Sequence, residues 1–470
     1  MVTQRLRAPR IDFSTLRREL ELPTEFPPAA QRVAEEAARR SEHPGHEDRT
    51  DIPFVTLDPA SSRDLDQAVH LARREKGYRV SYAIADVAAF VAPGDPLDAE
   101  VNRRGQTVYL PDGKVPLHPP VLSEGAASLL PDQTRPAVLW TIDVDPTGEP
   151  STVDVRRAMV RSRAKLSYED TQAALSAGRL PEPLGLLPEV GKLLAAAGLA
   201  RGAVSLPMPD QEIEPDGDGF RLVLRAPAAI EEYNAQISLL TGRVAAAMML
   251  AGRVGVLRTM PPAPPDALAR LRKAARALHI DWPGEEPVGA LLARLRPAEP
   301  RAAAFVEQAA DLLRGAGYTA FDGAVPDQPE HSAVAAPYAH VTAPLRRLAD
   351  RYATEVCLAL HAGAEVPAEV RAALPGLPET MARTDKVANA AERGAVDLVE
   401  AVLLRGRIGQ RFDAAVLDVD PKRNKATVAL DEPAVRARCD GPLTLGERAT
   451  VRLIEATPET RTVRFEPVQV

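Results

Sequence analysis

The sequence predicts an α+β protein of several domains, with a mixed α/β domain between a small helical region and a C-terminal five-stranded barrel. Its 470 residues exceed what one compact core usually organises. Strand-forming segments dominate residues 51–160, and helical periodicity dominates residues 168–404. After Gly406 the pattern changes to five short strand-like segments at regular spacing, which is typical of a small barrel.

Residues 1–48 are expected to form two short helices. Phe13, Leu16 and Leu20 share one helical face, and a second apolar stripe follows Pro27-Pro28. Two helices of this length cannot bury a core of their own, so we expect them to dock on a larger neighbour. A helix-turn-helix-like unit and a plain packing hairpin both fit the pattern, and the hairpin is favoured.

Residues 49–404 are expected to form the mixed α/β domain. It opens with the strand-like segments FVTL, YRVSYAIADV, TVYL and AVLWTIDVD, which are separated by Pro, Gly and Asp clusters. Long helices follow, interrupted by a predicted hairpin near residues 211–225. Residues 405–470 are expected to form the barrel from RFDAAVLDV, KATVAL, AVRARC, RATVRLIEA and RTVRFEPV.

Composition narrows the class of protein. The net charge of −7 taken alone argues against a nucleic-acid partner, but an enzyme that collects carboxylates around cations can be acidic while its RNA path is basic. The two cysteines, Cys357 and Cys439, are far apart, which argues against a disulfide framework and a zinc module. The N-terminus has no apolar run of signal-peptide type, so we expect a cytoplasmic protein without a membrane span.

Three carboxylates follow the first apolar strand. Asp58 ends the segment FVTLD, and Asp64 and Asp66 come after the loop PASSR. Acidic side chains that converge on a turn repel one another unless cations lie between them. Such clusters prefer Mg²⁺ or Mn²⁺, and one or two ions fit between protein oxygens and a phosphodiester. The alternative is that these aspartates merely form turns, and spacing alone favours that alternative.

Five separated blocks of the sequence resemble one family. They are FVTLDPASSRDLDQA, YAIADVAAFV, LDAEV, YLPDGKVPLHPPVLSEGAASLLPDQTRPA and YAHVTAPLRRLAD, in that order over about residues 51–400. Together they resemble the catalytic RNB domain of the ribonuclease II / ribonuclease R exoribonuclease family, and the barrel resembles its S1-type OB-fold. The resemblance implies a processive, Mg²⁺-dependent 3′→5′ hydrolase of single-stranded RNA with a free 3′ end, releasing nucleoside 5′-monophosphates. It also implies a monomer without an obligate protein partner.

The resemblance also implies which residues carry the chemistry. Asp58, Asp64 and Asp66 match three of four family aspartates at the metal site, and Gln67 stands at the fourth position. An amide offers a carbonyl oxygen but no charge, so Gln67 is a candidate ligand and the number of ions stays open. Arg346 and Arg347 match a basic pair beside the scissile phosphate, where a guanidinium stabilises transition-state charge. Without the family, a surface arginine pair would be favoured.

Further RNA contacts follow from the same resemblance. Tyr109 matches a tyrosine that stacks near the terminal nucleotide, and Tyr168 is expected to position the RNA end. Gln236 and Glu392 are assigned to ribose hydroxyls, because the 2′-OH distinguishes RNA from DNA.

The barrel carries many basic side chains and few aromatic ones, so we expect it to follow RNA phosphates without reading bases and to bind RNA with a strong salt dependence. A solvated barrel surface explains many of the same charges. The basic group consists of Arg436, Arg438, Lys422, Arg423, Lys425, Arg448, Arg452, Arg461 and Arg464.

One departure from the family pattern bears on function. Family members usually carry cold-shock-type OB-folds before the catalytic domain, and residues 1–48 leave no room for them. We therefore expect a more open RNA entrance and a weaker grip. Single-stranded tails would be shortened, and a stable duplex would stall the enzyme.

Three other functions compete with this interpretation. A catalytically weakened RNA-binding relative is favoured only by Gln67 and opposed by the three aspartates and two arginines. A Mg²⁺-dependent phosphohydrolase of small nucleotides gives the barrel no role. A DNA-binding protein that uses the N-terminal helices leaves most of the chain unexplained.

Overall fold

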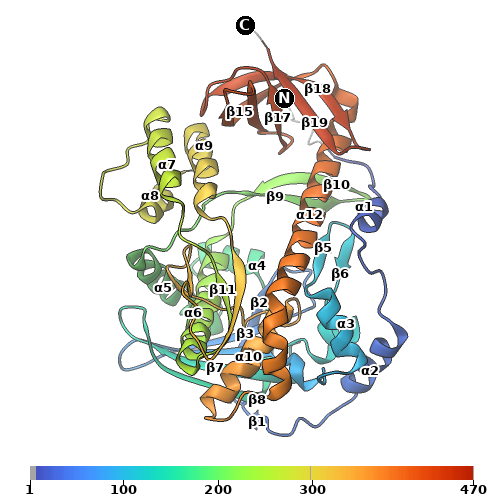
Figure 1. Ribbon diagram of the computed structural model, residues 1–470, viewed down its shortest axis with the longest axis vertical. Helices are drawn as coiled ribbons and strands as arrows, with labels where there is room; N and C mark the ends of the chain where they lie inside the picture. Colours follow the sequence, from blue (N-terminus) through green and yellow to red (C-terminus); the bar gives the residue numbers. More distant parts are fainter. Residues whose placement is uncertain (1–6, 297, 469–470) are drawn as a thin grey trace.

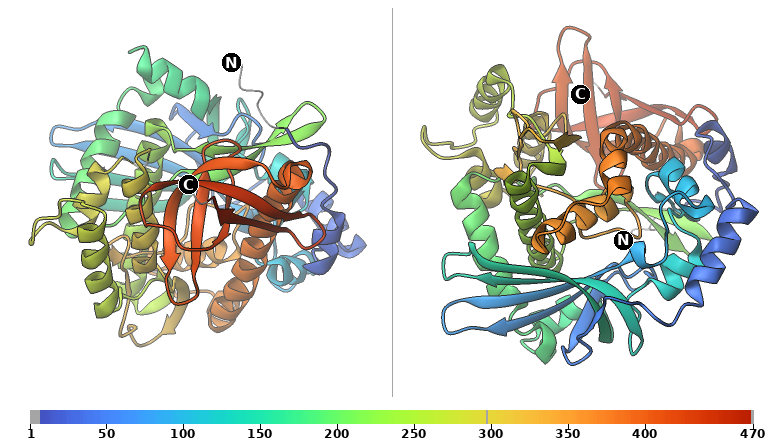
Figure 2. Two further views of the ribbon diagram at one scale, coloured as in Figure 1. Left: turned by 90° about the horizontal axis from the view of Figure 1, so that it is seen from above. Right: turned by 60° about the horizontal axis from the view of Figure 1, so that its bottom comes forward.

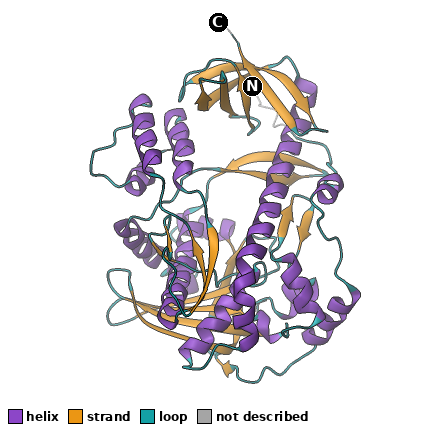
Figure 3. Cartoon of the chain, viewed as in Figure 1, coloured by secondary structure: helices purple, strands orange, loops and turns teal. Residues whose placement is uncertain are grey.

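A six-stranded sheet and a small closed barrel lie at opposite ends of the molecule, and the 28-residue helix α12 (Leu377–Leu404) runs between them (Figure 1). The computed structural model describes residues 7–296 and 298–468. Figure 3 shows that helices gather around the sheet while the barrel end is almost entirely strand. The predicted α+β class and the C-terminal five-stranded barrel are therefore confirmed.

The six-stranded sheet has the order β1–β8–β2–β3–β4–β7, and β8 also pairs with β7. The long strand β8 makes this possible, because its first part is antiparallel to β7 and its last part is parallel to β2. Asp58 at the end of β2 therefore lies opposite Ser167 at the end of β8. The strands are β1 (Glu47–Asp48), β2 (Phe54–Asp58), β3 (Gln67–Arg73), β4 (Tyr78–Ala85), β7 (Thr134–Val144) and β8 (Pro150–Ser167).

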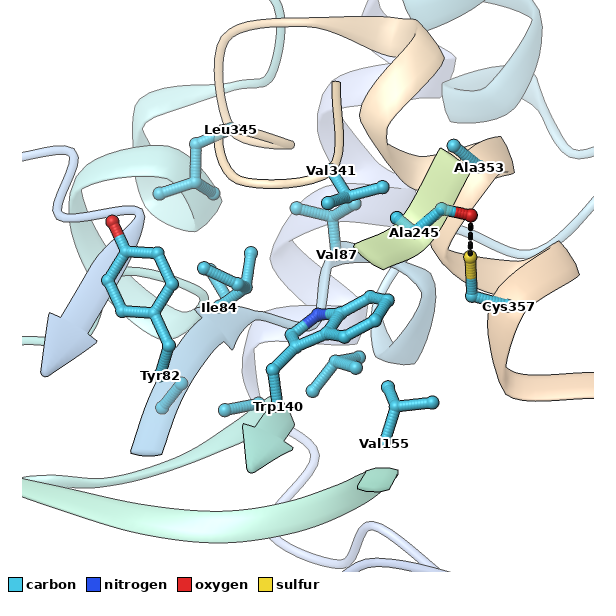
Figure 4. Packing of buried hydrophobic residues seen from close by; sticks show 14 of the residues in the cluster. Tyr82, Ile84, Val87, Trp140, Val155, Ala245, Val341, Leu345, Ala353 and Cys357 are labelled. Atoms are coloured by element: carbon cyan, nitrogen blue, oxygen red, sulfur yellow. Dashed lines mark hydrogen bonds between the residues drawn. The ribbon is translucent and has the colours of Figure 1, made fainter. Parts of the chain in front are cut away.

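Helices α6 (Ala229–Gly252) and α10 (Leu348–His361) pack against each other and against β8, and Figure 2 shows them on one side of the curved sheet. The core between them is apolar, with Trp140 and Tyr82 fully buried (Figure 4). Two stretches, Glu182–Arg201 and Ala229–Gly252, are long and apolar enough to cross a membrane. In the most apolar 18 residues of each stretch, 39% and 44%, respectively, are buried inside the protein. Packing in this core accounts for the apolar character of α6.

The remaining elements of the mixed domain lie around this core. The predicted hairpin near residues 211–225 is formed by β9 (Asp210–Asp216) and β10 (Gly219–Arg225). The others are α3 (Pro96–Arg104), β5 (Val108–Leu110), β6 (Gly113–Val115), α4 (Tyr168–Ser176), α5 (Leu187–Arg201), β11 (Val254–Thr259), α7 (Pro265–Ala277), α8 (Val288–Arg294), α9 (Pro300–Ala309), β12 (Gly317–Asp322), β13 (Glu330–His331), β14 (Ala336–Pro337) and α11 (Ala368–Ala373).

The two N-terminal helices, α1 (Ser14–Glu19) and α2 (Pro28–Ala38), dock on different neighbours. Helix α1 contacts α12, whereas α2 contacts α3. In the described residues they thus form neither a helix-turn-helix-like unit nor a packing hairpin, because each helix packs on a different element of the mixed domain. Residues 1–6 of the predicted helical region lie outside the described residues.

The closed barrel has the strand order β15–β16–β17–β19–β18. It contacts the mixed domain on two sides. Gln308 of α9 donates to Asp418 at 2.7 Å, and Glu400 of α12 accepts from the backbone N–H of Arg436 at 2.8 Å. The strands are β15 (Arg411–Asp420), β16 (Lys425–Leu430), β17 (Arg436–Asp440), β18 (Arg448–Thr457) and β19 (Thr462–Pro467).

Glu400 gives this junction a testable pH dependence. Burial raises the pKa of its carboxyl from 4.5 to about 7, despite hydrogen bonds from Arg436 and Gln211. Because the pKa of Glu400 is higher in the folded protein, the folded state favours the protonated carboxyl. The stability that Glu400 contributes is therefore fully present below about pH 4.5 and is lost as the pH rises through about 7. Glu400→Gln mimics the protonated group, so its free energy of unfolding should exceed that of the wild type by about 3 kcal/mol at pH 8. Denaturant titrations should show this difference shrinking towards zero near pH 4.5; a difference that does not change with pH would contradict the assignment.

Candidate active site

The loop between β2 and β3 carries the three predicted carboxylates and is held from both sides. Lys165 of β8 donates its ammonium to the carbonyls of Ala60 and Ser62, at 2.6 and 2.5 Å. The Ser128 hydroxyl donates to the Arg63 carbonyl at 2.7 Å and accepts from the Leu65 N–H at 2.9 Å. The backbone that presents the aspartates is therefore fixed before any ligand binds.

Asp58 has an unsatisfied oxygen. Its Oδ2 atom is buried and has no hydrogen-bond partner among the described residues. Burial raises the pKa of this carboxyl to about 6, Asp64 adds to the rise, and Arg346 opposes it. A buried carboxylate oxygen without a partner is costly, and a bound cation would remove that cost.

Asp66 is buried and bound by the segment that carries Arg346. Its Oδ1 accepts from the backbone N–H of Leu345 at 2.8 Å, and its Oδ2 accepts from Nε of Arg346 at 3.2 Å. Burial raises the pKa of this carboxyl to about 7, even though Arg346 and the Leu345 N–H act in the opposite direction.

Asp64 faces a lysine. Nζ of Lys114, in β6, lies 2.9 Å from Asp64 Oδ1 and 3.0 Å from Glu124. In the part of the chain that the structure describes, no three Asp, Glu, His or Cys side chains are arranged to hold a metal ion. The expected convergence of three carboxylates on one point is thus not seen, because Lys114 pairs with Asp64 and Arg346 pairs with Asp66.

The residues nevertheless fit a divalent cation. Asp58, Asp64 and Asp66 all belong to one strand end and its loop, and the electrostatic neighbours of Asp58 and Asp66 include Asp64 and Arg346. Hard carboxylate oxygens are the ligands that Mg²⁺ and Mn²⁺ prefer. The unpartnered Oδ2 of Asp58 is the atom that most needs such an ion.

The two arginines differ sharply in their surroundings. Arg346 keeps 43% of its side-chain exposure, and among the described residues only its Nε makes a hydrogen bond, to Asp66. Arg347 donates through Nε and Nη2 to both oxygens of the buried Asp350, at 3.0 and 2.9 Å. The Arg346 guanidinium is therefore available to a phosphate, whereas that of Arg347 is bound within the protein.

Gln67 is also committed to protein contacts. Its Nε2 donates to the Thr342 carbonyl at 2.6 Å, and its Oε1 accepts from the Tyr82 hydroxyl at 2.7 Å. Both the N–H and the oxygen of the Gln67 amide therefore make hydrogen bonds within the protein. This favours a role in positioning neighbouring residues over a role as an ion ligand.

Both predicted tyrosines have aspartates of the acidic loop among their electrostatic neighbours. Tyr109 of β5 is 52% exposed, and the electrostatic neighbours of its hydroxyl are Asp64, Arg346 and Asp66. The Tyr168 hydroxyl accepts from Asn234 of α6 at 3.1 Å and has Asp58 and Arg346 as electrostatic neighbours. An exposed ring beside the acidic loop is suited to stacking on a base.

A cavity of about 760 Å³ adjoins Tyr168. Helices α5 and α6 and residues 203–207 line it, and Gln236 is among the lining residues together with Glu231 and Glu232. The structure therefore brings Gln236 and Tyr168 to one cavity.

The other three predicted RNA contacts are not among the residues that line this cavity. Glu392 is exposed on α12. Arg436 is paired with Glu307 of α9 at 3.1 Å, and Arg438 is paired with Asp440 at 2.6 Å. Both barrel arginines thus have carboxylate partners.

Several residues with evident roles were not assigned from the sequence. Lys114 lies in the family block that begins YLPDGK, and Lys165 lies three positions before Tyr168, so a search for cations near the acidic loop could have found both. Asp350 accepts from the backbone N–H of Ala343, seven positions before it in the sequence. His118 contacts the carbonyl of Leu345, which is 227 positions away, so no nearby sequence pattern could have indicated its contact.

Two family models match the chain. The RNB domain model matches residues 46–360, and the RNase II-type exonuclease C-terminal S1 domain model matches residues 410–468. Among curated relatives, Ribonuclease R of Aquifex aeolicus is 26% identical, over 98% of this chain and 70% of its own length. Ribonuclease R of Escherichia coli is 28% identical, over 70% of this chain and 42% of its own length. The chain thus spans less than half of some of the relatives it matches.

Solved structures share the fold. Ribonuclease R of Mycoplasma genitalium, in complex with ribose-methylated single-stranded RNA, superposes with a TM-score of 0.85 at 20% identity, covering 97% of this chain and 77% of that one. Yeast Ssd1, described as a pseudonuclease, superposes with a TM-score of 0.69 at 17% identity, covering 90% of this chain and 54% of that one. Because the RNB model covers most of the chain and the S1 model covers its barrel, this protein belongs to the RNB family of RNase II-type exonucleases.

Proposed function

We propose that this protein is a 3′→5′ exoribonuclease that shortens single-stranded RNA by hydrolysis. The observation that supports this most directly is the half-exposed Arg346 guanidinium, held on the buried Asp66 in the same neighbourhood as the unpartnered Oδ2 of Asp58. A cation-binding carboxylate and a phosphate-binding guanidinium are groups that serve metal-assisted hydrolysis of a phosphodiester. The named activities of the relatives point in the same direction.

The finer proposal is that Mg²⁺ or Mn²⁺ is the cofactor and that nucleoside 5′-monophosphates are released. Asp58, Asp64 and Asp66 would hold one or two ions. A bound ion would polarise the phosphodiester and lower the pKa of an attacking water. The protein's own residues bind and orient the RNA: Arg346 contacts the non-bridging phosphate oxygens, and Tyr109 stacks on a base near the 3′ end. We further propose a cytoplasmic monomer that acts without an obligate protein partner.

The direct test uses end-labelled single-stranded RNA in Mg²⁺ and in EDTA. Release of labelled 5′-monophosphates from the 3′ end, in Mg²⁺ only, is the expected result. RNA binding without hydrolysis would favour the catalytically weakened relative. Yeast Ssd1, described as a pseudonuclease, shares the fold of this protein. Hydrolysis of a dinucleotide with no activity on longer RNA would favour the small-nucleotide phosphohydrolase.

The expectation about duplexes stays a prediction and needs its own substrate. A hairpin with a 3′ single-stranded overhang should lose the overhang, and digestion should stop at the stem. Complete digestion of the stem at moderate salt would contradict the expected weak grip. The same overhang without a stem is the control for intrinsic rate.

Metal binding should depend strongly on pH. The pKa values of Asp58 and Asp66, about 6 and about 7, are raised by burial in the ion-free protein, so both carboxyls are largely protonated below these values. A metal ion binds only the ionised forms and must displace these protons. The Mg²⁺ affinity measured by calorimetry should therefore fall by about tenfold or more from pH 8 to pH 6. An affinity that is constant over this range would contradict the displacement of protons from these two carboxyls on metal binding.

A further inference from the structure

The segment from Thr342 to Arg347, which carries Arg346, is tied to the protein through most of its backbone polar groups. The Arg346 carbonyl accepts from the Thr107 N–H at 3.0 Å, and the N–H of Leu348 donates to Gly105 at 2.9 Å. Inside the segment, the N–H groups of Arg346 and Arg347 donate to the Ala343 carbonyl at 3.1 and 2.9 Å. The side chains of Val341 and Leu345 point into the apolar core beside Ile84 and Trp140 (Figure 4). A loop fixed in this way presents its one exposed guanidinium in a defined direction.

Three side chains outside the segment complete these ties. The buried carboxylate of Asp350 accepts from the Ala343 N–H at 2.6 Å. Gln67 donates to the Thr342 carbonyl at 2.6 Å, and its other end is held by Tyr82, whose hydroxyl also contacts Ser238 of α6 at 2.9 Å.

His118 provides the third tie. Its Nδ1 lies 3.2 Å from the Leu345 carbonyl, and since a carbonyl only accepts, Nδ1 must carry the hydrogen. Burial lowers the pKa of His118 to about 4, which keeps the ring neutral at physiological pH.

We propose that Asp350, Gln67 and His118 are positioning residues that hold Thr342–Arg347 so that Arg346 faces the acidic loop. Arg347 belongs with these three residues and is not an RNA ligand; we call the four residues the frame. The inference deepens the proposed function and rests on it for the role of Arg346. It also gives Gln67 a purpose that an aspartate could not serve, because a shorter carboxylate has no N–H to donate to the Thr342 carbonyl.

Arg347 is held by Asp350 and is not free to bind RNA. Both oxygens of Asp350 are used, by Arg347 and by the Ala343 N–H, and the carboxylate is fully buried. If Arg347 moved to a phosphate, the buried carboxylate of Asp350 would lose its charge partner, which is strongly unfavourable. Arg346 has no such commitment beyond one hydrogen bond to Asp66.

The chain offers a matched control for Asp350. Asp98 is also a buried aspartate that accepts from an arginine of α10, Arg351, at 2.7 Å, and from a backbone N–H, that of Gly94, at 2.9 Å. It makes no hydrogen bond to Thr342–Arg347 among the described residues. Asp98→Asn should therefore reproduce the loss of a buried ion pair without disturbing the frame.

The test is a double-mutant cycle with Arg346→Ala, using steady-state hydrolysis of single-stranded RNA. Asp350→Asn and Gln67→Leu should each lower kcat by about 10- to 100-fold and leave KM within about twofold, since a misplaced group loses transition-state contacts first. In the Arg346→Ala background the same two substitutions should lower kcat by less than about twofold, because the guanidinium that they position is absent. Asp98→Asn should keep kcat in both backgrounds.

Hydrogen–deuterium exchange keeps the inference separate from the proposed function. Exchange at residues 342–347 should be faster in Asp350→Asn and Gln67→Leu than in wild type and in Asp98→Asn. Equal kcat losses in both backgrounds, or unchanged exchange, would overturn the frame. Arg347→Lys should lower kcat, and a raised KM with unchanged kcat would instead make Arg347 an RNA ligand. If the exchange rates at residues 342–347 differ between the variants as expected but the wild type hydrolyses no RNA, the proposed function is wrong and the positioning role of the frame still holds.

Discussion

Asp66→Asn is expected to lower the rate of RNA hydrolysis by about 10³-fold or more while RNA binding is retained. The substitution keeps the shape and an oxygen that accepts from the Leu345 N–H, but it removes the charge that a metal ion and Arg346 require. Single-turnover hydrolysis in Mg²⁺ and filter binding of the same RNA in EDTA measure the two effects separately.

The stability of this variant provides an internal check. Burial raises the pKa of Asp66 to about 7, so the ionised carboxylate is costly above that pH and a neutral amide relieves the cost. The melting temperature in EDTA at pH 8 should therefore be no lower than that of the wild type. Asp51→Asn, at an exposed position before β2, is the control and should hydrolyse RNA normally. Near-normal activity of Asp66→Asn would remove Asp66 from the catalytic set.

Arg346→Ala is expected to lower kcat by about 10²- to 10³-fold with a small effect on KM, because the guanidinium acts on charge that develops in the transition state. Arg346→Lys should recover only part of the loss, since an ammonium cannot bind two phosphate oxygens in one plane. Rates at saturating and limiting RNA separate the two constants. Arg371→Ala, which removes an exposed arginine paired with Asp322, is the control. An effect on KM alone would make Arg346 a binding residue without a role in the chemical step.

The parts of the fold that follow from local sequence patterns were predictable. The continuous apolar run in FVTLD gives the fully buried strand β2, and the alternating apolar residues in KATVAL give β16. Gly-Asp-rich residues between apolar runs give the hairpin β9–β10. The placement of Asp58 at a strand end and of Asp64 and Asp66 in the loop after it also follows from such patterns.

Contacts between distant residues could not be predicted in this way. Asp64 meets Lys114, and Asp66 meets the N–H of Leu345 from 279 positions away, so the carboxylates face cations and not one another. The sequence pattern Arg346-Arg347 suggests two equivalent phosphate ligands, but only the fold reveals that Asp350 binds the second. The docking of α1 on α12 and of α2 on α3 likewise depends on surfaces that no local pattern encodes.

The ion pairs of the barrel have a consequence for how the protein responds to ionic strength. Most of its arginines already have carboxylate partners within the protein, namely Arg436, Arg438, Arg448, Arg452, Arg461 and Arg464. A phosphate that takes such an arginine displaces an internal anion, so little net positive charge is delivered to the RNA and few condensed counterions are released. The logarithm of the RNA affinity should therefore fall with the logarithm of the salt concentration less steeply than six free arginines would require.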